Sequence, residues 1–175
     1  RVGRTICPAC GRELRPDSAE RAANAALALP EGTRIHVAFP FTRSAKLVHT
    51  RIVEHLRAKG FVRVIADGAH HHLDELDTGK PNLAKVKELL VVTDRVAVDA
   101  QVRTRLTDAL ESAFREGDGD AVVVAEGHEP LRFTTTFRCP NDGHVAPDPT
   151  PQLFSFNNPR GACGTCNGFG ANLAF

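Results

Sequence analysis

The polar and apolar positions along the chain follow two different rhythms. Where apolar residues recur every three to four positions, the pattern predicts an amphipathic helix, and where they alternate with polar residues or run together it predicts a strand. Helical spacing occurs over 17–29, 46–59 and 100–115. Asp17 and Asp99 stand where the first and third of these stretches begin, and we expect each to cap its helix. In the third stretch the buried stripe is expected to hold Val102, Leu106, Ala109, Leu110 and Ala113.

Alternating or continuous apolar residues predict six strands, at 33–39, 61–66, 69–73, 89–98, 121–126 and 131–137. Asp67 and Gly68 are typical of a two-residue hairpin turn, so the second and third strands should pair. The last two strands predict another hairpin. The stretch 74–81 is polar and irregular, and no element is predicted there. This mixture predicts an α+β fold, with a mixed α/β inserted domain that contains β-hairpins and about three helices, flanked by a small zinc-knuckle module.

The composition changes after Arg138, where Pro, Gly and Asn become frequent. We therefore divide the chain into 1–14, 15–137 and 138–175, with the middle part inserted between two cysteine-bearing flanks. The formal net charge of +1 gives no general basic signal for nucleic-acid binding. No apolar run is long enough to predict a transmembrane helix. The chain begins without Met, and we expect a piece of a longer cytoplasmic protein.

The five cysteines lie near the two ends of the chain. Cys7 and Cys10 form a CxxC pair followed by glycine, which we call the first knuckle. Cys163 and Cys166 form a CxxCxGxG motif, the last knuckle. An odd number of unevenly spread cysteines does not fit a secreted disulfide framework, and CxxC pairs of this kind are typical of zinc ligands. A redox role is disfavoured because neither pair follows a clear strand and opens a helix.

Between these two lies the middle knuckle, which begins at Cys139. Asp142 takes the place of the second cysteine there, and His144 follows. Because zinc accepts oxygen and nitrogen ligands as well as sulfur, Asp142 or His144 could complete a site. The middle knuckle could share a metal with the first knuckle or with the last. We favour the first, since the chain enters and leaves the inserted domain at Cys10 and Cys139.

Several irregular strings in the chain resemble the UvrA family, the ATPase and damage-sensing subunits of the bacterial UvrABC excinuclease. The run PQLFSFNNPRGAC at 151–163, followed by the last knuckle, is similar to the segment that enters the first ABC signature domain. CPACGRE at 7–13 and LPEGTR at 29–34 are similar to the start of the UvrB-binding domain. KGFVRV at 59–64 and Asp94-Arg95 are similar to its middle and later parts. The resemblance covers nearly the whole chain.

The resemblance implies that the full-length parent is an ABC-type ATPase that binds ATP, dimerises, binds damaged DNA and loads UvrB. This chain would hold the UvrB-binding domain and the first zinc module. It contains no GxxxxGK[ST] loop, so we expect no catalytic residue here and no ATP hydrolysis by this chain alone. The alternative is a zinc-ribbon module that contacts DNA in a UvrA paralogue and no longer binds UvrB.

Docking of a protein partner needs exposed charges on rigid elements. The candidate partner-binding residues are Arg43, Lys46, Arg63, Asp94, Arg95, Arg103 and Arg105, of which Asp94 and Arg95 are favoured because they end a strand and match the family. His70 and His72 share one face of a predicted strand, but no fixed acidic or cysteine ligand lies near them in the sequence. We therefore expect no metal site at these histidines.

Overall fold

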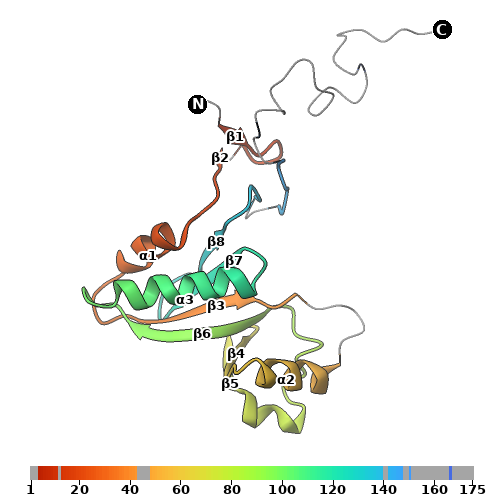
Figure 1. Cartoon of the computed structure of the whole chain (residues 1–175). Coiled ribbons are helices and arrows are strands. Elements are labelled where there is room, and N and C mark those ends of the chain that lie inside the picture. The colour runs from red at the N-terminus through yellow and green to blue at the C-terminus, as the bar shows by residue number, and fades with distance from the viewer. Residues whose placement is uncertain are drawn as a thin grey trace, which may run out of the picture. The chain divides into compact units, whose positions relative to one another are not determined.

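The computed structural model describes residues 4–11, 13–42, 48–139, 142–147, 150 and 166. Its contacts divide the chain into two compact units, Arg1–Arg15 with Phe137–Phe175, and Pro16–Thr136. We call the first the flanking unit and the second the inserted unit. Figure 1 follows the chain through both.

The inserted unit is a six-stranded antiparallel sheet with helices, which confirms the predicted α+β class. The strands lie in the order β5-β4-β6-β3-β7-β8, and each neighbouring pair is antiparallel. Its elements are α1 (Ala19–Leu27), β3 (Arg34–Pro40), α2 (His49–Ala58), β4 (Arg63–Ala66), β5 (Ala69–His72), the 3-10 helix η1 (Leu73–Thr78), β6 (Leu89–Ala97), α3 (Arg103–Glu116), β7 (Asp120–Ala125) and β8 (Leu131–Thr134).

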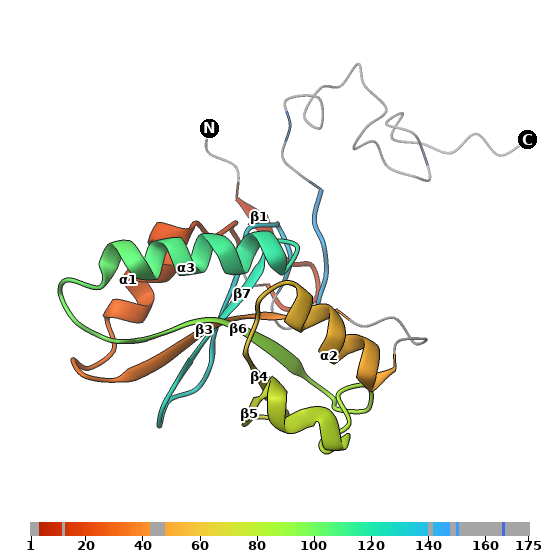
Figure 2. The same ribbon diagram turned by 60° about the horizontal axis from the view of Figure 1, so that its bottom comes forward.

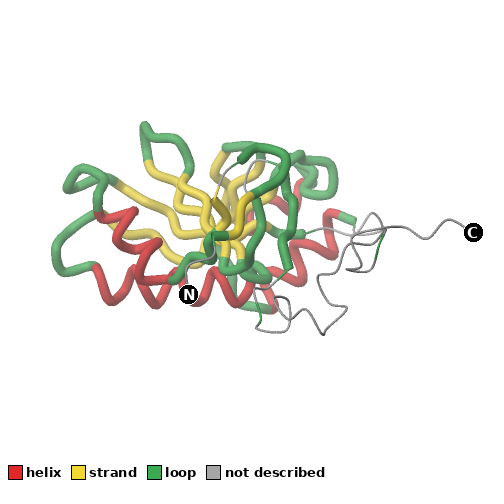
Figure 3. The backbone as a smooth tube through the Cα atoms, turned by 90° about the horizontal axis from the view of Figure 1, so that it is seen from above, coloured by secondary structure: helices red, strands yellow, loops and turns green. Residues whose placement is uncertain are grey.

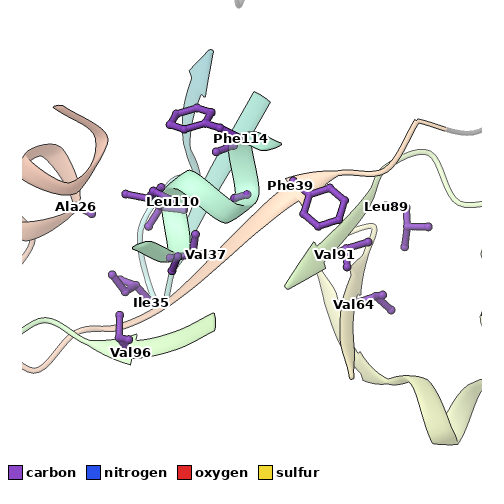
Figure 4. Packing of buried hydrophobic residues seen from close by; sticks show 14 of the residues in the cluster. Ala26, Ile35, Val37, Phe39, Val64, Leu89, Val91, Val96, Leu110 and Phe114 are labelled. Carbon is purple, nitrogen blue, oxygen red and sulfur yellow. The ribbon is translucent and has the colours of Figure 1, made fainter. Parts of the chain in front are cut away.

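One face of the sheet carries the main hydrophobic core. Helices α1 and α3 lie side by side over the half that contains β3, and α2 lies beside β4 and β5 (Figure 2). All of these helices contribute to the same core cluster, so they pack on one face of the strands (Figure 3). In Figure 4, Ile35 and Val37 of β3 lie near Leu110 of α3, whereas Phe39 lies toward Val91. Burial of this apolar face stabilises the unit.

Two local features shape the sheet. Asp67 and Gly68 both have positive φ, 48° and 84°, which is the geometry that a tight β4–β5 hairpin requires and confirms the predicted turn. The register between β3 and β6 shifts at Val37 and Ala38, where Thr93 is the extra residue of a bulge. The Thr93 hydroxyl donates to the carbonyl of Val37 at 3.1 Å, which holds the bulge in place. A bulge of this kind bends a sheet and increases its twist.

The N-terminal cap of α1 differs from the prediction. Ser18 caps the helix, because its side-chain oxygen accepts the backbone N–H of Arg21 at 3.2 Å. Asp17 is instead bound to the end of β8: its N–H donates to the carbonyl of Thr134 at 2.7 Å, and its carboxylate accepts the N–H of Thr134 at 3.2 Å. Asp17 is therefore bonded to a strand that is distant in the sequence, although local spacing predicted that it caps the helix.

Helix α3 also begins later than predicted. Asp99 does not cap it, since the Asp99 carboxylate accepts the N–H of Gln101 at 3.0 Å in a turn that precedes the helix. The predicted stripe is buried at Leu106, Ala109, Leu110 and Ala113, while Val102 is half-buried and Phe114 adds to the stripe. No helix in the described part of the chain is long and apolar enough to cross a membrane.

The stretch predicted to be irregular contains η1, and His49 at the start of α2 holds it. The Nε2 atom of His49 lies 2.7 Å from the carbonyl of Leu76, and its Nδ1 accepts the N–H of Leu83 at 3.0 Å. These partners fix a neutral tautomer in which Nε2 carries the proton. A single histidine thereby ties α2 to η1 and to the following loop, a role that sequence spacing does not reveal.

Candidate metal centre

The first knuckle sits in the turn of a short antiparallel ribbon. β1 (Thr5–Ile6) and β2 (Glu13–Leu14) pair on either side of it. The turn is closed by Gly11, whose N–H donates to the carbonyl of Cys7 at 2.9 Å and whose φ is +70°. Because this left-handed conformation suits glycine, the residue after Cys10 lets the chain fold back and bring the two thiols together.

The middle knuckle repeats this geometry with one change of ligand. The N–H of Gly143 donates to the carbonyl of Cys139 at 2.9 Å, and Gly143 has φ +72°, as in the first knuckle. The Cys139 N–H in turn donates to the carbonyl of His144 at 2.7 Å. Asp142 therefore occupies the position that a second cysteine has in the first knuckle.

Four side chains from the two knuckles converge within the flanking unit. The sulfurs of Cys7, Cys10 and Cys139 and a carboxylate oxygen of Asp142 all lie within 4.8 Å of one another. The Cys7 thiol donates to Oδ2 of Asp142 at 3.1 Å, and the sulfurs of Cys10 and Cys139 are 3.5 Å apart. Cys7 and Cys139 are buried, whereas Cys10 and Asp142 are exposed. The cluster therefore has a closed side and an open side.

The electrostatics of the cluster distinguish its two kinds of ligand. Burial raises the pKa of the Cys7 thiol to about 11, so this group is protonated at neutral pH while no cation is present. The backbone N–H of His144 donates to Oδ1 of Asp142 at 2.9 Å, and this bond, followed by that from the Cys7 thiol, holds the carboxyl pKa below its ordinary value. A bound cation would replace the Cys7 proton, because thiolates rather than thiols ligate metals.

The donor set and its spacing fit zinc. Tetrahedral zinc takes thiolate sulfur at about 2.3 Å, which places neighbouring sulfurs roughly 3.7 Å apart. The 3.5 Å between the sulfurs of Cys10 and Cys139 is close to that spacing. The backbone bond to Oδ1 of Asp142 also leaves Oδ2 facing Cys7, as a monodentate ligand requires. Three sulfurs and one oxygen could thus hold a zinc ion in a structural site with four protein ligands.

The structure separates the ligand candidates predicted from sequence. It brings the first and middle knuckles together, with Asp142 rather than His144 as the fourth group. The side chain of His144 is exposed, and its contribution is the backbone N–H that orients Asp142. Cys166 is half-buried, and Cys163 lies outside the described residues. In the described part of the chain this cluster is the one group of three or more metal-ligating side chains that meet closely.

The favoured docking residues line a groove in the inserted unit. It lies where β4 begins and β6 passes its bulge, and its walls include Arg63, Asp94 and Arg95. Arg63 and Arg95 are exposed, and neither forms an ion pair with another described residue. The groove therefore has two available guanidinium groups at its rim.

The other docking candidates divide into two groups. The guanidinium group of Arg105 donates two hydrogen bonds of 2.8 Å to the carboxylate of Asp94. These bonds hold the pKa of the Asp94 carboxyl below its usual value. Arg103 donates to the side-chain carbonyl of Asn24 at 2.6 Å, which links α3 to α1. These contacts give Arg103 and Arg105 structural partners within the unit. Arg43 and Lys46 lie outside the described residues.

Comparison with known proteins identifies the inserted unit. Residues 17–127 match the family model described as the UvrA interaction domain. The chain belongs to the UvrA interaction domain family. It is 34% identical to UvrABC system protein A of Clostridium acetobutylicum, 37% to that of Bacillus subtilis and 38% to that of Pseudomonas aeruginosa, over 99%, 99% and 100% of this chain. The family resemblance expected from the sequence is thereby confirmed.

This interaction domain represents a small share of the proteins that it matches. The chain spans 18% of the length of the Clostridium and Bacillus relatives and 19% of the Pseudomonas relative. The matched range contains the groove with Arg63 and Arg95, whereas both knuckles of the metal cluster lie outside it. The family match and the metal cluster are therefore separate observations.

The histidines of the interaction domain make contacts within the domain. His72 accepts the N–H of Asp74 on its Nδ1 atom, 3.4 Å away, where the chain enters η1. His70 lies against His36 of β3, with ring centroids 4.4 Å apart. The sequence does not predict a role for His36, because two strands, β4 and β6, separate its strand from that of His70 in the sheet and no local spacing connects the two residues.

Proposed function

We propose that this chain is the part of a UvrA-type excinuclease subunit that docks UvrB, with a structural zinc ion at the knuckles of its flanking unit. Membership of the UvrA interaction domain family and the names of the relatives support the docking role. ATP binding, DNA binding and dimerisation belong in this proposal to the longer parent protein, since the chain spans about a fifth of its relatives.

The observation that carries the docking proposal is the groove between β4 and β6. Arg63 and Arg95 stand at its rim with exposed guanidinium groups, on strands that the main core holds rigid. The adjacent Asp94–Arg105 pair fixes α3 against β6 beside them. A guanidinium group recognises a carboxylate through two parallel bonds, which gives both orientation and affinity.

Reversing the charge at this rim should abolish most of the docking. In the chain carrying both Arg63→Glu and Arg95→Glu, we expect binding to UvrB to weaken at least roughly 100-fold, because each attraction becomes a repulsion. The dissociation constant would be measured by isothermal titration calorimetry with the 175-residue chain.

The control for this experiment is Arg51→Glu. Arg51 is also an exposed arginine, but it lies on α2 outside the groove, where it pairs with Glu54 at 3.3 Å, so binding should change less than about twofold. If the folded wild-type chain does not bind UvrB, the docking proposal is wrong. A chain that binds duplex DNA but not UvrB would instead support the alternative function, a DNA-contact module of a UvrA paralogue.

The zinc proposal makes a separate prediction about the fourth ligand. Asp142→Ala leaves three sulfur ligands, and we expect zinc affinity to fall at least roughly tenfold, whereas Asp142→Cys should tighten binding because zinc prefers thiolate to carboxylate. Affinity would be measured by competition with a coloured chelator. His144→Ala is the matched control, since it retains the backbone N–H that orients Asp142. A larger loss for His144→Ala than for Asp142→Ala would assign the ligand to His144.

A further inference from the structure

The sheet face opposite the helices holds a second, small apolar cluster. Its buried members come from four strands, and none comes from a helix: Ala38, Ile65, Leu90, Val92 and Val122. In Figure 3 the helices lie on the other side of the strands. Burial of these side chains therefore comes from the sheet itself, which has a bulge at Thr93. Because the rings of His36 and His70 meet across this face from strands that are not neighbours, the face is concave.

His36 and His70 meet across this concave face. They belong to β3 and β5, which are separated in the sheet by β4 and β6. In a flat sheet, strands with two others between them are about 14 Å apart, so side chains on them rarely touch. The 4.4 Å between the two ring centroids shows how strongly the face curls.

The surroundings of this histidine pair are predominantly positive. Arg95 stands directly opposite His36 in the register of β3 and β6. The charged and titratable groups that act on His36 are His70 from β5, Arg95 from β6 and Arg63 from β4, with Glu126, just after β7, as the one acidic group. Arg63 and Arg95 also line the docking groove. The histidine pair and the groove rim therefore form one continuous basic cluster.

Burial of His36, followed by repulsion from these cations, keeps its pKa below the ordinary histidine value. In the free chain at neutral pH, the His36 imidazole is consequently uncharged. An anion placed among these groups would reverse the balance, since it attracts the protonated form of each imidazole. The cluster has two guanidinium groups that bind carboxylates, and beside them is the uncharged imidazole of His36, which can gain a proton when a carboxylate arrives.

We propose that the His36–His70 pair, together with Arg63 and Arg95, is a proton-linked recognition site for carboxylate groups on the docking partner. The inference rests on the proposed docking of UvrB and adds that docking takes up protons. By linkage, a complex that binds more protons than its separate components becomes tighter as pH falls. Docking is therefore strongest on the acidic side of neutrality, and histidine substitutions reduce this dependence.

The test measures the dissociation constant of the 175-residue chain with UvrB at pH 8.0 and pH 6.0 and fixed ionic strength. For the wild-type chain we expect binding about three- to tenfold tighter at pH 6.0, with net proton uptake seen by calorimetry in buffers of different ionisation enthalpy. His70→Gln, at an exposed position, and His36→Gln should each reduce the pH dependence to less than about twofold. His71→Gln is the matched control, because His71 pairs with Val64 and belongs to the other face.

The possible results of these binding measurements distinguish the proton-linked site from its alternatives. Binding with equal pH dependence in the wild-type chain and in both histidine variants overturns it while leaving the docking proposal intact. Absence of UvrB binding at both pH values overturns the docking proposal and this inference together. If duplex DNA, rather than UvrB, binds with a pH dependence that His70→Gln removes, the cluster recognises phosphate and the inference is wrong about the partner. Thermal unfolding of His36→Gln identifies misfolding, and His70→Gln keeps the test decisive in that case.

Discussion

Replacing Cys10 with alanine should remove the metal from this chain. The wild-type protein is expected to carry about one zinc ion. Cys10→Ala is expected to carry almost none, because it removes one of the thiolates that zinc prefers and leaves two sulfurs and one oxygen. Cys10 is the informative choice among the cysteines. It is exposed, so its replacement removes a ligand and takes almost nothing from the packing of the flanking unit.

Metal loss should also unfold the flanking unit. Among the described residues of that unit, the apolar cluster contains four buried residues, Cys7, Leu14, Cys139 and Ala146, with Phe137 packed against them. Two of these four are proposed ligands, so the described part of the unit keeps little apolar burial without the ion, and small domains of this kind rely on the metal to fold. Addition of a strong chelator to the wild-type chain should increase proteolysis within 1–15 and 137–147 and leave the inserted unit resistant.

Elemental analysis of purified protein measures the expected loss, with Cys166→Ala as the control. Cys166 is outside the four-ligand cluster, so that variant should keep its zinc. The opposite pattern, with zinc retained in Cys10→Ala and lost in Cys166→Ala, would show that the middle knuckle pairs with the last one. Equal zinc content in all three proteins would remove the proposed site altogether.

The sequence predicts most of the inserted unit because its elements depend on short-range patterns. The Asp67-Gly68 turn predicts the β4–β5 hairpin from two residues, and the two positive φ values confirm it. The caps were wrong at Asp17 and Asp99 for different reasons. Asp17 is bonded to Thr134, more than a hundred positions away, and the Asp99 side chain closes a turn before the helix starts. Spacing alone cannot show which backbone N–H group will donate to a given carboxylate.

In the candidate metal site, too, short-range patterns predict some features and others depend on the folded structure. The CxxC spacing and the missing second cysteine predict Cys7, Cys10 and Cys139, since each knuckle is a local turn. The choice between Asp142 and His144 depends on a backbone bond, from the N–H of His144 to Asp142, that only the folded turn reveals. The contact between His36 and His70 is further from prediction still, because it requires the bend that a one-residue bulge introduces into the sheet.

The largest loss of stability from a single methyl group is expected at Gly117, which follows α3. Its N–H donates to the carbonyl of Ala113 at 2.8 Å, and its φ is −99°, so the backbone itself accepts any residue. The limit on a larger residue at Gly117 is the lack of space for its Cβ atom. A Cβ atom at Gly117 would overlap the carbonyl oxygen of Asp120 and lie 2.7 Å from Cβ of Phe39. A backbone oxygen cannot rotate away as a flexible side chain can, so the end of α3 or the start of β7 must shift.

We expect Gly117→Ala to lower the free energy of unfolding of the inserted unit by about 3 kcal/mol, at the upper end of the usual range for overpacking. Gly60→Ala is the matched control, because nothing lies within 4 Å of its added Cβ while its φ is +83°. That substitution should cost about 1 kcal/mol, the ordinary penalty of a left-handed non-glycine residue. Urea unfolding followed by far-UV circular dichroism measures both values. Equal losses would show that the contacts between Gly117, Phe39 and Asp120 do not limit the packing of α3 against the sheet, and that the core which positions the docking groove tolerates expansion there.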